Sequence, residues 1–109
     1  MTDLKTLRKQ LTEVDMKIID LIHQRQSLSK KIGSMKRKEG QPTRDFLREK
    51  QVLELATSHA EKLNMEPDVI VDVMQLLIRS SLKTQEKARV QAERQGSGRS
   101  ALVIGGAGR

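Results

Sequence analysis

The sequence predicts an all-α fold in which three helices form a single domain. Two short segments that contain glycine, proline or asparagine, Gly40–Pro42 and Asn64–Pro67, punctuate the chain. The stretches around them carry apolar residues three or four positions apart, the spacing that gathers side chains on one face of a helix. A length of 109 residues suits one domain and is too short for two. We expect helices at about 3–38, 44–63 and 67–92.

The first predicted helix, residues 3–38, has the most regular apolar pattern in the chain. Its positions step alternately by three and four, a heptad repeat that lets long helices pack along their length. Arg25 interrupts this repeat, and because a buried guanidinium without a partner is costly, we expect a carboxylate beside it. A salt bridge that only fixes helix register is the alternative to a functional role. The heptad seam comprises Leu4, Leu7, Leu11, Val14, Ile18, Leu21, Arg25, Leu28, Ile32 and Met35.

The other two predicted helices also carry polar side chains on their apolar faces. Glu49 interrupts the apolar stripe of residues 44–63, and the stripe of residues 67–92 turns polar at Ser81 and Gln85. Each of these residues alone has a simple explanation, a satisfied core contact or a helix end. Taken together with Arg25, they predict a polar pocket inside a helical bundle, where bundle proteins usually build their sites.

Helical geometry adds further candidates to this pocket. Lys36 follows Arg25 by eleven residues, close to three turns, so the two side chains share a face about 16 Å apart along the axis. Asp45 and Arg48 lie within one turn of Glu49.

Arg8 presents a distance problem. It precedes Lys36 by 28 residues, or about 42 Å along a continuous helix, which is too far for both to hold one small ligand. Arg8 therefore belongs to the pocket only if a second chain supplies it or the helix bends sharply. An ordinary solvated charge is the explanation that the sequence alone favours.

The charge of the chain suggests an anionic partner. The formal net charge is +7, with many of the basic residues near the end of the first predicted helix. Phe46 is the only aromatic residue, so the chain has no stacking platform for single-stranded bases. A small anionic metabolite explains the arginines at least as well as nucleic acid does. A basic helical module for dimerisation or nucleic-acid binding stays open as an alternative.

Several other classes of protein are disfavoured. There is no cysteine, which excludes a disulfide framework and a thiolate metal site and fits a reducing cytoplasm. His23 and His59 belong to no metal-ligand spacing. The charged N-terminus has no signal-peptide core, and no apolar run approaches the roughly 20 residues that span a bilayer. We expect a cytoplasmic protein without membrane contact.

The combined pattern resembles the active-site signature of the all-helical chorismate mutases, with matching spacing over about residues 3–90. The resemblance implies conversion of chorismate, a small dicarboxylate, to prephenate by a Claisen rearrangement without metal or cofactor. It also implies an intertwined homodimer whose crossing first helices share their active sites. The residues that carry it are Arg8, Arg25, Lys36, the segment Arg44–Glu49, and the segment Ser81–Gln85.

The resemblance implies a role for each candidate. Lys36 and Gln85 would donate hydrogen bonds to the ether oxygen of the substrate, while Arg25 and the partner's Arg8 would clamp one carboxylate. The other four candidates have binding roles: Arg48 and Ser81 at the second carboxylate, and Glu49 and Asp45 around the ring hydroxyl. An isochorismate-pyruvate lyase resembles these mutases and stays an alternative within the same fold.

The end of the chain suggests a second domain after a mutase domain at 1–93. Residues 94–109 are expected to form an irregular linker and the truncated start of a dinucleotide-binding domain. The run Ala101–Arg109 has the pattern of a strand entering a glycine turn, with a G-x-G-x-x-G fingerprint that would begin at Gly106. It resembles the junction of fused chorismate mutase–prephenate dehydrogenases and so argues against the lyase. NAD would bind only the missing part of that domain.

Overall fold

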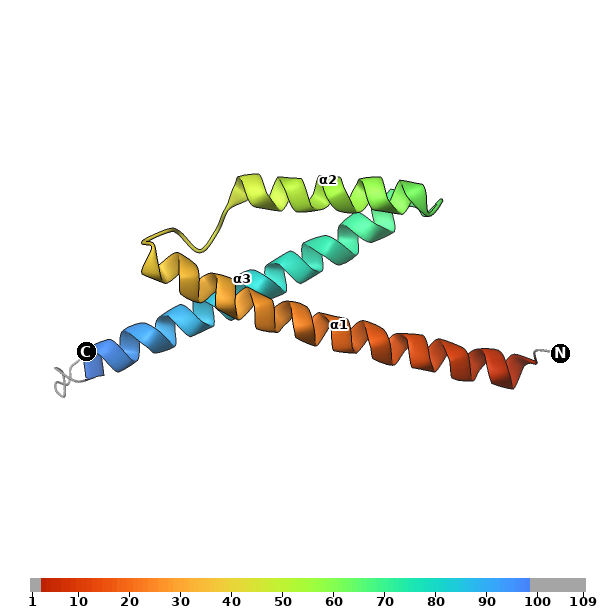
Figure 1. Cartoon of the computed structure of the whole chain (residues 1–109), viewed down its shortest axis with the longest axis horizontal. Helices are drawn as coiled ribbons and strands as arrows, with labels where there is room; N and C mark the ends of the chain where they lie inside the picture. Colours follow the sequence, from red (N-terminus) through yellow and green to blue (C-terminus); the bar gives the residue numbers. More distant parts are fainter. Residues whose placement is uncertain (1–2, 99–109) are drawn as a thin grey trace.

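A computed structural model describes residues 3–98 of the chain, and within that range it contains three helices and no strand (Figure 1). They are α1 (Leu4–Lys38), α2 (Phe46–Lys62) and α3 (Pro67–Gly98). The all-α fold of three helices predicted from the sequence is confirmed. The dimer stays a prediction.

Local capping determines where α1 begins and ends. The Asp3 carboxylate accepts a hydrogen bond from the Thr6 backbone N–H at 2.8 Å, and the hydrogen bonds from Thr6 hold the pKa of Asp3 below its ordinary value. At the other end Gly40 has a φ of +69°, a left-handed conformation that suits glycine. The Gln41 N–H then returns to the Lys36 carbonyl at 2.8 Å. This Schellman turn ends α1 within one turn of Lys36.

The start and end of α2 follow the same chemistry. The Asp45 carboxylate accepts from the Arg48 backbone N–H at 3.1 Å, so Asp45 is the N-cap. After the helix, Asn64 adopts a φ of +56° and the Met65 N–H bonds to the Ala60 carbonyl at 2.9 Å. Asparagine tolerates this left-handed position better than most residues do, so it ends α2 as glycine ends α1.

The three helices form an open arrangement in which α3 packs against both of the others and α1 and α2 do not contact each other. In Figure 1, α3 leaves the far end of α2, crosses α1 and continues beyond it, while the N-terminal half of α1 extends alone. The radius of gyration is 19.8 Å. A compact domain of this length would have one of about 13 Å. The single chain therefore does not enclose a full core.

The heptad seam of α1 lies on the surface of the single chain. Its nine apolar side chains are between 49% and 63% exposed. The face that α1 turns toward α3 is instead the neighbouring stripe that contains the buried Ser29 and Gly33. Within residues 3–98 the buried hydrophobic side chains are those of Ala60 and Ile78. Within residues 3–98 most of the seam is therefore left uncovered, and only Arg25, Leu28 and Ile32 face the cavity between the helices.

The end of α3 corrects one expectation. The sequence predicts an irregular segment from about residue 94, but α3 continues as helix to Gly98. Propensity is a weak guide here, because extending an existing helix by one residue is far easier than starting one. The run Ala101–Arg109 lies outside the described residues, and the assignment of residues 94–109 to a linker and second domain stays a prediction. No described helix is both long enough and apolar enough to cross a membrane.

Candidate active site

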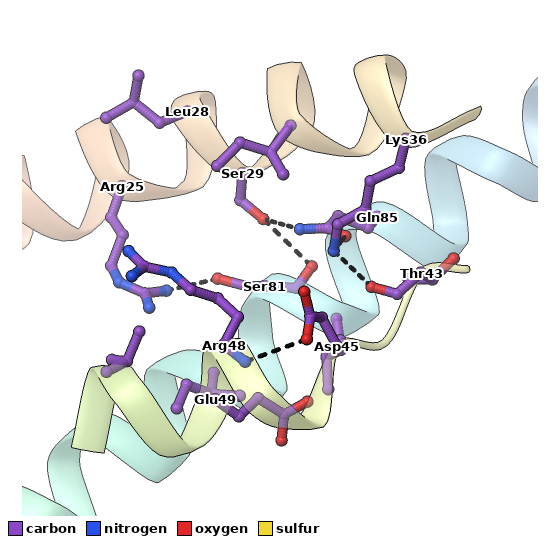
Figure 2. Close-up of a pocket in the computed structure, with 14 residues that line it drawn as sticks. Arg25, Leu28, Ser29, Lys36, Thr43, Asp45, Arg48, Glu49, Ser81 and Gln85 are labelled. Atoms are coloured by element: carbon purple, nitrogen blue, oxygen red, sulfur yellow. Dashed lines mark hydrogen bonds between the residues drawn. The ribbon is translucent and has the colours of Figure 1, made fainter. Parts of the chain in front are cut away.

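A cavity of about 310 Å³ opens where the second half of α1, the start of α2 and the second half of α3 meet (Figure 2). Seven of the eight candidate residues line it. Apolar side chains from all three helices form much of the remaining wall. The lining residues are Arg25, Leu28, Ser29, Ile32, Lys36, Thr43, Asp45, Arg48, Glu49, Val52, Ile78, Ser81, Leu82 and Gln85.

Lys36 and Gln85 meet at one end of the cavity (Figure 2). The Lys36 ammonium donates to the Thr43 carbonyl at 2.6 Å and to Gln85 Oε1 at 3.4 Å. The Gln85 amide donates through Nε2 to Ser29 Oγ at 2.9 Å. An ammonium has three donors and a primary amide has two, so each group retains one N–H for a ligand.

Among the described residues, Arg25 does not have the carboxylate partner that its place in the seam predicts. It donates to the Leu77 carbonyl at 3.1 Å and to the Ser81 hydroxyl. The expectation was wrong because neutral oxygens can satisfy guanidinium donors without neutralising the charge. Burial lowers the pKa of Arg25 from its ordinary value, and the nearby positive charge of Arg48 lowers it further. The uncompensated positive charge of Arg25 makes the part of the cavity around it attractive to an anion.

The start of α2 supplies the acidic part of the cavity wall. Asp45 combines its capping bond to the Arg48 N–H with a place in the wall. Arg44 grips Glu49 with two parallel hydrogen bonds, Nε to Oε2 at 3.0 Å and Nη2 to Oε1 at 3.1 Å. This is the one ion pair among the described side chains, and the Arg44 guanidinium also lies 4.3 Å from the centre of the Phe46 ring. Glu49 is therefore neutralised by Arg44, while Arg25, Lys36 and Arg48 leave the cavity positively charged.

Arg8 is the candidate that the structure keeps apart from the cavity. It lies in the exposed first turns of α1, and α1 is a single uninterrupted helix from Leu4 to Lys38. A sharp bend that would bring Arg8 to Lys36 is absent from this helix (Figure 1). Of the two routes that would bring Arg8 to the site, only a second chain remains.

Ser29 and Thr43 line the cavity, and Arg44 holds Glu49 from outside its wall, but the sequence alone assigned no role to any of the three. Ser29 could have been found, because it follows Arg25 by four positions and precedes Lys36 by seven, which places all three on one helical face. Arg44 has the right sequence distance from Glu49, but it precedes the N-cap, where helical periodicity gives no guide. Thr43 contributes through its backbone carbonyl, which no side-chain pattern reveals.

The cavity is suited to bind a small anion and to donate hydrogen bonds to it. It combines two guanidinium groups, an ammonium and an amide with an apolar wall, a combination typical of sites that orient polar metabolites. In the described part of the chain, no group of three or more His, Cys, Asp or Glu side chains is placed to hold a metal ion.

Comparison with known proteins gives a family match over most of the chain. Residues 7–86 match the family described as chorismate mutase type II. A bifunctional chorismate mutase/prephenate dehydratase of Buchnera aphidicola subsp. Schizaphis graminum is 36% identical over 85 residues, which are 78% of this chain but only 22% of that protein.

Two further relatives differ in how much of their length is matched. A chorismate mutase of Methanocaldococcus jannaschii is 30% identical over 84 residues, covering 77% of this chain and 85% of that protein. The T-protein of Enterobacter agglomerans is 32% identical over 83 residues, covering 76% of this chain and 22% of that protein. The matched region therefore makes up nearly all of one relative and about a fifth of the two others.

Proposed function

The chain belongs to the chorismate mutase type II family, and from this premise we propose that it converts chorismate to prephenate in phenylalanine and tyrosine biosynthesis. The observation that carries the proposal is the arrangement of the cavity: two hydrogen-bond donors, Lys36 and Gln85, at one end and two guanidinium groups, Arg25 and Arg48, in the same wall. The Methanocaldococcus relative is a chorismate mutase and is matched over most of its length, which supports this assignment.

The proposed reaction is an isomerisation within one substrate molecule. An ether C–O bond breaks while a C–C bond forms, and negative charge grows on the ether oxygen in the transition state. The remaining N–H groups of Lys36 and Gln85 would stabilise that charge, and the cavity would hold the reactive chair-like conformer. A millionfold acceleration would need about 8 kcal/mol of such assistance.

The two carboxylates of the substrate account for the arginines. Arg25 has no carboxylate partner in the described part of the chain, so it is charged and available to clamp an incoming one. In the proposal Arg8 of the partner subunit completes this clamp, Arg48 and Ser81 hold the other carboxylate, and Glu49 with Asp45 contacts the ring hydroxyl.

We propose that the active species is a homodimer. The exposed seam of α1 would bury against the second chain the seven half-exposed apolar side chains that do not line the cavity. If each gains about 1 kcal/mol, the seam contributes on the order of 10 kcal/mol per chain, comparable to the cost of association. A dimer with crossing α1 helices would also bring Arg8 of one chain to the cavity of the other.

A turnover assay on the purified chain tests the proposal. Chorismate should be consumed with prephenate as the product, while isochorismate should give no pyruvate and duplex DNA should not be bound. Pyruvate release from isochorismate without chorismate turnover would replace the proposal with the lyase. Tight, salt-sensitive DNA binding by a chain without either activity would favour the basic helical module.

The domain downstream of the mutase is proposed to be a prephenate dehydrogenase. The glycine pattern of Ala101–Arg109 supports this, because a dinucleotide-binding domain begins with a strand that enters such a turn. The relatives support a fusion but not this particular partner, since the Buchnera protein carries a prephenate dehydratase. Reading the gene beyond codon 109 tests it: the fingerprint should be completed, with an acidic residue about 20 positions later.

A further inference from the structure

The most deeply buried polar side chains of the described residues touch each other. Ser29 is 4% exposed and Gln85 is 6% exposed. Gln85 Nε2 donates to Ser29 Oγ at 2.9 Å, and Ser29 Oγ in turn donates to the Ser81 carbonyl at 3.3 Å (Figure 2). Buried polar side chains are nearly always hydrogen-bonded, because each unpaired donor or acceptor in the interior is costly.

The direction of these hydrogen bonds determines how the Gln85 amide is oriented. A hydroxyl has a single proton, and Ser29 gives it to Ser81, so Ser29 can only accept from Gln85. The NH₂ end of the amide must therefore face Ser29. The other end, Oε1, accepts from the Lys36 ammonium at 3.4 Å. If the amide were flipped, its NH₂ group would face the Lys36 ammonium, donor against donor. Its oxygen would also compete with the Ser81 carbonyl for the single proton of Ser29.

Gly33 leaves the space in which the aliphatic part of the Gln85 side chain packs against α1. A Cβ built on Gly33 would lie 2.9 Å from Gln85 Cγ and 3.3 Å from its Cβ, distances that a real side chain does not reach without a shift. The missing side chain lets α3 approach α1 one turn beyond Ser29. The stem of Gln85 is thus held against Gly33 while its amide is held between Ser29 and Lys36.

From this geometry we propose that Ser29 is a positioning residue that orients the Gln85 amide so that its second N–H points into the cavity. The proposal rests on the proposed function, in which that N–H donates to the ether oxygen. Ser29 does not itself touch the substrate. It acts through Gln85, so its removal should matter only while Gln85 is present.

A double-mutant cycle in the full 109-residue chain tests this dependence. Ser29→Ala should lower kcat for chorismate on the order of tenfold with KM little changed, the effect of a slightly misplaced donor. In a Gln85→Ala background the same substitution should change kcat less than about twofold. An equal loss in both backgrounds would assign Ser29 a merely structural role and overturn the proposal, as would an unchanged kcat in Ser29→Ala.

Ser80 provides a matched control. Its hydroxyl accepts from Gln26 Nε2 at 3.2 Å, so it also joins α1 to α3, but it does not line the cavity. Ser80→Ala should leave kcat unchanged. If Ser29→Ala does not fold, Ser29→Cys, which keeps the size but accepts hydrogen bonds weakly, replaces it.

Nuclear magnetic resonance separates this proposal from the proposed function. The side-chain NH₂ signals of Gln85, identified by their loss in Gln85→Ala, should include one proton that is protected from exchange in the parent chain, the one bonded to Ser29 Oγ. In Ser29→Ala this proton should shift and lose its protection. That result in a chain without chorismate turnover would overturn the proposed function and uphold the orientation of Gln85, whereas signals unaffected by Ser29→Ala would overturn the orientation itself.

Discussion

Mixing two inactive variants should restore activity if Arg8 serves the cavity of the other chain. Arg8 lies 28 residues before Lys36 on one uninterrupted helix, a separation of about 42 Å, so it cannot reach its own cavity. Arg8→Ala and Arg25→Ala should each lose on the order of a hundredfold in kcat/KM, because each removes half of a charged clamp on the same carboxylate.

The expected recovery can be calculated. Refolding equal amounts of the two variants together should give heterodimers as about half of all dimers, by random assortment of a two-fold assembly. In each heterodimer one cavity combines an intact Arg25 with an intact Arg8 from its partner, and the other cavity lacks both. The mixture should therefore show about one quarter of the parent activity per chain. Chorismate consumption measures it, and mass spectrometry of differently tagged chains verifies the heterodimers.

The doubly substituted chain, Arg8→Ala with Arg25→Ala, is the matched control. Refolded with an equal amount of the parent, it should give about one quarter of full activity if Arg8 acts across the dimer, and about one half if Arg8 acts within its own chain. Heterodimers that are present but inactive in the first mixture, together with one half in the second, would refute the shared site.

The remaining predictions concern single positions in the cavity. Lys36→Ala should lower kcat on the order of a hundredfold or more while the far-ultraviolet circular dichroism is preserved, and near-normal kcat would remove Lys36 from the mechanism. Gln85→Glu should be poor at neutral pH and recover on acidification, because a carboxyl donates a hydrogen bond only when protonated; a flat profile of kcat/KM like that of the parent would exclude Gln85 as the ether-oxygen donor. Asp45→Ala should reduce the free energy of unfolding by about 1 kcal/mol and lower the thermal midpoint, because α2 loses its cap, whereas Asp45→Asn should retain the stability. Equal midpoints for those two variants would mean that the capping bond contributes nothing.

Much of the fold could be predicted because the helices and their ends are determined by residues close together in the sequence. The ends of α1 and α2 follow from Gly40 and Asn64, which lie in the two segments that punctuate the sequence and act on their immediate neighbours. The end of α3 was misjudged because Gly96 and Gly98 disfavour a helix only weakly once one is already formed.

The cavity was predictable in its residue types but not in its contacts. Periodicity identified Arg25, Glu49 and Gln85 as polar groups on apolar faces, and the structure brings them to one cavity. Periodicity does not say which partner a polar group finds. Arg25 bonds to neutral oxygens of α3, and Glu49 is held by Arg44, a residue in the loop before its helix. The Arg25 pairing depends on how α1 and α3, far apart in sequence, cross, and the Arg44 pairing depends on the conformation of the loop before α2; a pattern along one helix contains neither.

The distribution of polarity in this chain links the site to the dimer. A single chain usually buries apolar side chains and exposes polar ones, but here Ser29 and Gln85 are buried while the apolar seam of α1 is exposed. The buried polar face of α1 is turned toward α3 and serves the cavity together with Arg25, Leu28 and Ile32 of the seam, so the rest of the apolar seam is available to the second chain of the proposed dimer. Both faces belong to the same turns of one helix. A partner that covers the seam therefore holds α1 in place against α3, and with it the hydrogen bonds from Ser29 through Gln85 to Lys36. In the proposed dimer, α1 would thus serve both catalysis and association, and the second chain would help a chain with so small a core of its own to keep its cavity ordered.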